Sequence, residues 1–162
     1  ARLAEKITLT ETNNKESSDC AFLGGLLHET GKLIFAEHFM DSYLEIIQSA
    51  EKERVSYTLL EKNKFDTSHS EVGAYLLNLW KLPEEIVHCA YYHEKPEKIS
   101  EVEENFGVVN AVFSANVITS SENPDHKGLM GDFDAKYMET HNLGEKLKGW
   151  IRLYETITET DS

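Results

Sequence analysis

Residues 21–33 read AFLGGLLHETGKL, and this stretch decides the fold. Its first seven residues are apolar or glycine, which is typical of a helix that is buried on most sides rather than of an amphipathic surface helix. We expect this helix to span residues 20–28 and to break near Glu29-Thr30, where Gly31 follows. A second apolar segment, residues 32–39, then continues the chain, so the stretch predicts two consecutive helices around a buried core.

Helical patterns extend along the rest of the chain. Ser68 and Glu71 fit a capping box, which predicts a helix from this point to about Lys81. A second match at residues 100–103 predicts the start of a long helix that reaches about residue 118. We expect two closing helices, at about residues 134–140 and 143–157. Because no strand-like alternation or internal repeat is visible, the sequence predicts an all-α fold with antiparallel neighbouring helices.

Composition excludes several classes of function. The chain has 162 residues, with 29 acidic against 16 basic side chains and a formal charge of −13. Phosphate neutralisation requires clustered Lys and Arg, so we expect no nucleic-acid partner and no docking on anionic membranes. No apolar stretch approaches the roughly 18–20 residues that cross a bilayer. The two cysteines, Cys20 and Cys89, form no disulfide framework, and we expect a cytoplasmic protein.

The first residues of the sequence lack the signals of a helix start. Leu3 and Ile7 lie four residues apart, as on one face of an amphipathic helix, yet no N-cap precedes them. We therefore expect residues 1–162 to form a single domain that lacks its N-terminal part. A polar loop is expected to follow at residues 10–18.

Three of the seven histidines lie on apolar helix faces. His28 ends the most apolar helix, His69 begins the helix of the capping box, and His93 continues the face of Ile86 and Ala90. A buried imidazole needs partners for its ring nitrogens, and one shared metal ion would serve all three. The alternative is that each histidine is a core residue with its own hydrogen bonds, and spacing alone leaves both interpretations open.

Three motifs, in the same order, resemble a known family. Residues 21–33 are similar to the LLHDIGKL core of the HD superfamily of metal-dependent phosphohydrolases. HSEVGAYLL at residues 69–77 resembles its H-x-x-x-G-x-x-L helix, and residues 80–93 resemble a W-x-L-P-x-x-I segment that ends in His. This combination resembles the HDOD branch, a bacterial signalling and regulatory domain, over residues 21–118. The resemblance implies an HD-domain-like helical bundle, which residues 134–157 would close.

The resemblance also implies a metal site with altered ligands. Catalytic members hold one or two metals with a His-Asp pair, further histidines and a final Asp. The matching positions here are His28, Glu29, His69, His93 and Asn116. The extra methylene of Glu29 displaces its carboxylate by more than about 1 Å, which is large for a catalytic site. Asn116 removes one negative charge, and the first family histidine would precede Ala1.

Lys32 matches the lysine that follows glycine in the family motif. It would be the catalytic candidate, because an ammonium group can neutralise a substrate phosphate, although an exposed lysine at a helix start is the simpler interpretation. With two ligands altered, we expect no bound cofactor; the alternative is a divalent metal such as Mn, Fe, Ni or Zn.

Three functions follow from these residues. The first is a regulatory signalling module that acts through protein interaction or ligand sensing without hydrolase activity, with other signalling proteins or an upstream domain as partners. The second is a metal-dependent phosphohydrolase of nucleotides or cyclic dinucleotides. The third is a structural helical domain whose histidines are remnants. The oligomeric state does not follow from the sequence.

Overall fold

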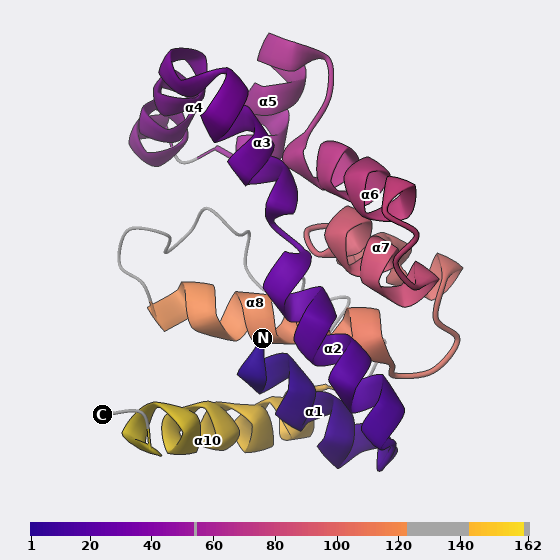
Figure 1. The fold of residues 1–162 in the computed structure, drawn as a ribbon. Coiled ribbons are helices and arrows are strands. Elements are labelled where there is room, and N and C mark those ends of the chain that lie inside the picture. The colour runs from indigo at the N-terminus through magenta and orange to yellow at the C-terminus, as the bar shows by residue number, and fades with distance from the viewer. Residues whose placement is uncertain (54, 123–142, 161–162) are drawn as a thin grey trace.

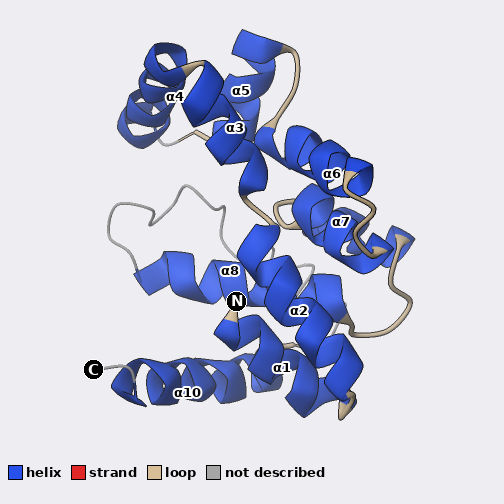
Figure 2. Cartoon of the chain, viewed as in Figure 1, coloured by secondary structure: helices blue, strands red, loops and turns tan. Residues whose placement is uncertain are grey.

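The computed structural model describes residues 1–53, 55–122 and 143–160, and within these ranges the chain is helical without strands (Figure 2). The all-α prediction is therefore confirmed. The described elements are α1 Arg2–Thr12, α2 Lys15–Leu27, α3 Thr30–His38, α4 Met40–Glu53, α5 Tyr57–Phe65, α6 His69–Leu79, α7 Glu84–Tyr92, the 3-10 helix η1 Pro96–Glu101, α8 Val108–Glu122 and α10 Gly144–Thr160.

The helices form two groups that α6 and α7 connect (Figure 1). At one end α1 packs against α2, α8 and α10, and at the other end α3, α4 and α5 pack together. The pair α6–α7 joins the groups, since α6 packs on α3 and α5 while α7 packs on α2 and α8. Each group has its own apolar core, around Ile7, Val112 and Trp150 in the first and around Phe35 and Ile46 in the second.

Gly31 allows helices α3 and α6 to approach each other closely. A Cβ atom at this position would overlap the carbonyl oxygen of His69 and come within 2.7 Å of the carbonyl carbon. It would also lie 2.9 Å from the backbone nitrogen of Gly73. Real Cβ atoms do not approach backbone atoms so closely, and only glycine allows the start of α3 to touch the start of α6.

Helix α10 is held on α1 by one acidic side chain. The Glu11 carboxylate accepts a hydrogen bond from the indole N–H of Trp150 at 3.0 Å and pairs with the Lys146 ammonium group at 2.6 Å. Trp150 is itself buried in the core of this end of the molecule. The bond satisfies the one polar atom of a large buried side chain, so α10 has a fixed register on α1.

Of the two predicted capping boxes, the structure contains one. The capping box at Ser68 and Glu71 is present, with both of its hydrogen bonds. The match at residues 100–103 is not one, because residues 96–101 form a 3-10 helix and α8 begins only at Val108. The Glu103 carboxylate instead accepts the backbone N–H groups of Val109 and Asn110, at 2.9 and 3.0 Å, and so caps α8 from outside the helix.

The predicted polar loop at residues 10–18 is also wrong. Helix α1 continues to Thr12 and α2 begins at Lys15, so only Asn13 and Asn14 connect them. Asn13 adopts a left-handed conformation and Asn14 caps α2 with its side chain, which explains why two residues suffice.

The closing segment is described in part. The expected helix at residues 143–157 is present as α10, which extends to Thr160. The expected helix at residues 134–140 lies outside the described residues. None of the described helices is both long and apolar enough to cross a membrane.

We predict that Gly31→Ala destabilises the protein by about 3 kcal/mol or more, because the added methyl group forces α3 and α6 apart. Gly73→Ala is the matched control. Its Cβ would lie 3.1 Å from Gly31 N and 3.6 Å from Gly31 Cα, and alanine favours the helix by about 1 kcal/mol. Urea unfolding would measure both free energies, and equal losses would contradict the close contact at Gly31.

Candidate functional site

The three predicted histidines lie at helix ends that meet. His28 follows the last residue of α2, His69 is the first residue of α6, and His93 follows the last residue of α7. The rings of His28 and His93 pack edge to face with centroids 4.9 Å apart, and those of His69 and His93 are 5.3 Å apart. His69 and His93 are completely buried and His28 is partly buried, so the structure brings the three imidazoles into one cluster.

A buried carboxylate fixes the orientation of His69. Glu61 in α5 is fully buried, and its Oε2 atom accepts both the backbone N–H of His69 at 2.8 Å and the ring Nδ1 at 2.7 Å. The Tyr43 hydroxyl donates to the other carboxylate oxygen at 3.2 Å. Burial, and then Glu61, raise the pKa of Tyr43, so its hydroxyl stays a donor. With Nδ1 donating to Glu61, the Nε2 atom of His69 faces the other histidines.

Backbone carbonyls orient the other two rings in the same way. His28 Nδ1 lies 3.0 Å from the Gly25 oxygen, and His93 Nδ1 lies 2.9 Å from the Ala90 oxygen. A carbonyl oxygen only accepts, so Nδ1 carries the proton and Nε2 carries the lone pair in each neutral ring. Burial lowers the pKa of His28 and of His93, which favours these neutral forms.

The Nε2 atoms of His69 and His93 lie close to each other. His69 Nε2 and His93 Nε2 are 3.2 Å apart, and two lone pairs at that distance repel unless a proton or a cation joins them. Metal–nitrogen bonds of about 2.1 Å to both atoms would enclose an angle of about 100°, between octahedral and tetrahedral values. The pair therefore fits one metal ion as well as it fits a shared proton.

A carboxylate that the motifs did not assign lies beside this pair. Glu94 Oε1 is 3.7 Å from His69 Nε2, and its other oxygen accepts from the Thr58 hydroxyl. Burial raises the pKa of Glu94, but His69, His93 and the hydrogen bond from Thr58 lower it, and the net pKa lies below its usual value. One atom from each of His69, His93 and Glu94 lies within 4.8 Å of the others, which is a spacing that a metal ion can bridge.

His28 supplies an unpaired nitrogen. Its Nε2 atom is enclosed and has no hydrogen-bond partner within the part of the chain that the structure describes. His28 and Asn116 both line a small pocket of about 50 Å³ between α1, α2 and α8. Asn116 thus lies near His28, but it is not part of the three-residue cluster. An orphaned buried nitrogen normally has a water or an ion as its partner.

Glu29 and Lys32 form an ion pair at the edge of the cluster. The Lys32 ammonium group contacts the Glu29 carboxylate and lies 5.2 Å from the Tyr57 ring centroid. Burial alone would raise the pKa of Glu29, but Lys32 and then His28 lower it to about 2. The carboxylate is thus ionised and already bound to a cation, which leaves it less available as a ligand than the family Asp.

The sequence interpretation missed Glu61, Glu94 and Tyr43. An acidic residue in a polar helix is ordinarily exposed, so nothing marked Glu61 as a buried partner. A signal existed for Glu94, since residues 93–94 repeat the His-Glu pair of residues 28–29.

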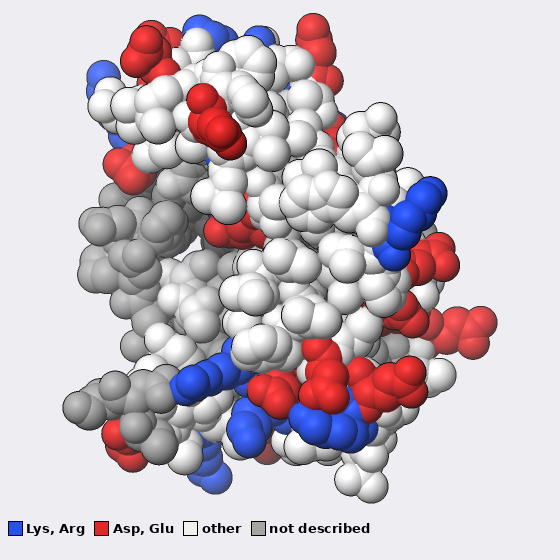
Figure 3. All heavy atoms as spheres, in the orientation of Figure 1, with Lys and Arg blue, Asp and Glu red and all other residues white. Residues whose placement is uncertain are grey.

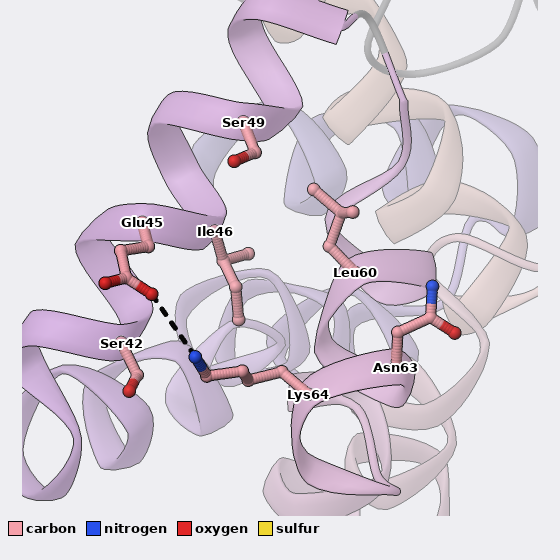
Figure 4. Close-up of a pocket in the computed structure, with 7 residues that line it drawn as sticks. All are labelled: Ser42, Glu45, Ile46, Ser49, Leu60, Asn63 and Lys64. Atoms are coloured by element: carbon pink, nitrogen blue, oxygen red, sulfur yellow. Dashed lines mark hydrogen bonds and ion pairs between the residues drawn. The ribbon is translucent and has the colours of Figure 1, made fainter.

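A larger hollow lies away from the histidines. It measures about 230 Å³ between α4 and α5, and Ile46 and Leu60 line it together with the Glu45–Lys64 ion pair at 3.2 Å (Figure 4). No residue of the histidine cluster lines it, so it is not an access route to the candidate site.

Comparisons with known proteins place the fold and the motifs in one family. The family model described as "HDOD domain" matches residues 1–96. A protein of Treponema pallidum (strain Nichols) named "Uncharacterized protein" is 25% identical over 73 residues, which cover 45% of this chain and 14% of that relative. The comparison with solved structures gives no match. Because the family model covers more than half of its length, this chain belongs to the HDOD domain family.

Proposed function

We propose that the chain is a regulatory HDOD module of bacterial signal transduction, which acts through protein interaction or ligand sensing and does not hydrolyse phosphoesters. The observation that carries this proposal is the enclosure of the histidine cluster. His69 and His93 have no exposed surface, and the pocket at His28 holds only about 50 Å³. A site for a ligand the size of a nucleotide usually measures 300 Å³ or more.

The residues around the cluster support the same proposal. Hydrolysis needs an activated water, a positioned base and a group that neutralises the phosphate. Lys32, the candidate for the last role, is held by Glu29 and stands over Tyr57. Glu29 is displaced from the family position by its longer side chain, and Asn116 carries no charge. These features favour a regulatory module without hydrolase activity over an active phosphohydrolase.

The alternative is a metal-dependent phosphohydrolase of nucleotides or cyclic dinucleotides. One observation favours it. The hydrogen bonds of His28, His69 and His93 all engage Nδ1, which leaves each Nε2 atom free to bind a metal. Metal binding alone does not supply room for a substrate, so this alternative also needs the cluster to open.

Exposed apolar side chains on α6 support an interaction role. Tyr75, Leu79 and Trp80 at this helix and its end are 71%, 59% and 58% exposed. Figure 3 shows a broad area over α6 and the adjoining part of α2 with few charged side chains, although the chain as a whole is strongly acidic. An apolar surface between charged regions is typical of a protein contact, and we propose other signalling proteins or an upstream domain as the partner.

We also propose that the module works in the cytoplasm. Cys20 and Cys89 are both free, as thiols are in a reducing compartment.

The proposal predicts no metal-dependent turnover of bis-p-nitrophenyl phosphate or of a cyclic dinucleotide with added Mn²⁺, Fe²⁺ or Ni²⁺. Release of nitrophenolate and chromatography of the nucleotide would measure it. His69→Ala is the control, because a contaminating enzyme would be unaffected by it. Turnover by the wild type that disappears in His69→Ala would establish the hydrolase instead.

Substitutions on the exposed face of α6 are expected to change the free energy of unfolding only slightly. Leu79→Asp and Trp80→Glu are expected to alter the free energy of unfolding by less than about 0.5 kcal/mol, because these side chains touch little of the core. Leu77→Ala on the same helix is the comparison, since Leu77 is completely buried and its truncation costs about 2–5 kcal/mol. Urea unfolding separates the two cases, and a large loss at Leu79 or Trp80 would assign that face to the fold.

A further inference from the structure

We propose that the exposed apolar side chains of α2 and α6 dock an amphipathic helix of a partner protein, and that this helix carries Lys or Arg on its polar side. We call the surface the α2–α6 face; it consists of Leu23, Leu26, Tyr75, Leu79 and Trp80. The inference rests on the proposed function, because it names the chemistry of the partner that an interaction module binds.

The face exposes large apolar side chains on both helices. On α2, Leu23 is 43% exposed and Leu26 is 62% exposed, and the exposed side chains of α6 are still more accessible. Figure 3 shows one broad area with few charged side chains over α6 and the adjoining part of α2. Apolar surface in contact with water is unfavourable, so a partner that covers this face gains free energy.

Helix α7 holds the two parts of the face beside each other. Cys20 and Leu27 of α2 pack against the core that Leu77 of α6 shares with Ile86 of α7. These inward residues fix α2 and α6 on the same helix, and the exposed leucines of α2 are left on the outer surface. The face is therefore built on packed helices rather than on a loop.

The spacing of the exposed side chains suits a helical partner. Tyr75 and Leu79 are four residues apart on α6, and Leu23 and Leu26 are three residues apart on α2. Such rows form the ridges between which the side chains of another helix pack. The described residues contain no strand, so they offer no sheet edge to which an extended partner could bond.

Acidic side chains border the face where α7 begins. Glu84 and Glu85 are exposed in the first turn of α7, shortly after Trp80. Burial, and then Glu85 and Glu16, raise the pKa of the Cys20 thiol, so a carboxylate of α7 and one of α2 lie near the same residue. Figure 3 shows acidic side chains along the right-hand edge of the uncharged area and, together with basic ones, along its lower edge.

This acidic rim attracts a cation from outside the chain. Glu84 lies 3.5 Å from the His88 ring, and among the described residues neither Glu84 nor Glu85 pairs with a lysine or an arginine. The whole chain has a formal charge of −13, so a second copy and an anionic membrane are both repelled. Lys or Arg on a partner helix would complement the rim, while the apolar side of that helix covers the face.

The test is the fluorescence anisotropy of a labelled peptide of about four helical turns, with Leu and Lys at the spacing of an amphipathic helix. We expect it to bind the wild type, and the same peptide with Glu in place of Lys not to bind. Leu79→Asp with Trp80→Glu is expected to weaken binding at least about tenfold. Both changes add negative charge, so attraction by net charge alone would tighten binding instead, and that result would overturn the proposal.

Two double variants with the same change of charge test the rim. Glu84→Gln with Glu85→Gln is expected to weaken binding about threefold to tenfold and to reduce its dependence on salt. Glu155→Gln with Glu159→Gln, at exposed positions of α10, is expected to leave the affinity within about twofold. Equal losses in both variants would overturn the proposal, because the peptide would then bind the acidic surface as a whole. Circular dichroism shows that each variant is folded.

Sedimentation velocity of the wild type without peptide distinguishes a partner from a second copy. We expect a monomer. A dimer that Leu79→Asp with Trp80→Glu separates would overturn the proposal, because another copy of this chain would then occupy the face. Hydrolysis is measured independently by the phosphodiester assay, so failure of this proposal and failure of the proposed function give different results.

Discussion

The backbone contact between Gly31 and His69 is the constraint on which the rest of the molecule depends. Because no side chain separates them, the first turn of α3 lies directly on the first turn of α6. The contact lies beside the histidine cluster, because His28, two residues before α3, packs on the His93 ring, which in turn packs on His69. Gly31 therefore serves both the packing of α3 on α6 and the arrangement of the polar cluster, and a larger residue there would damage both.

The cluster shows how a fold can retain polar residues in its interior when they bond one another. Glu61, Tyr43 and His69 satisfy one another, and such a network stabilises only if every member is bonded. Glu61 accepts three hydrogen bonds at its centre, from the Tyr43 hydroxyl and from the backbone N–H and ring Nδ1 of His69.

Sequence reasoning recovered the features that depend on neighbouring residues and missed those that depend on distant ones. The capping box at Ser68 is local, and apolar periodicity placed the three histidines on inner faces, so both were predictable. The cap of α8 was not, because the pattern at residues 100–103 indicates a helix start there, whereas the Glu103 carboxylate reaches forward to the backbone of Val109 and Asn110. Glu61 and Glu94 were missed for the same reason, since an acid becomes a buried partner only when another helix brings a donor to it.

The bond between Glu11 and Trp150 joins residues that are 139 positions apart. At a translation rate of 5–20 residues per second, the ribosome delivers the second partner between about 7 and 28 s after the first. During that time α1 has no α10 to cover its apolar face, which includes the buried Leu3 and Ile7. The part of this face that α10 covers thus stays exposed in the nascent chain until Trp150 has been made, which is longer than in a domain of local pairings.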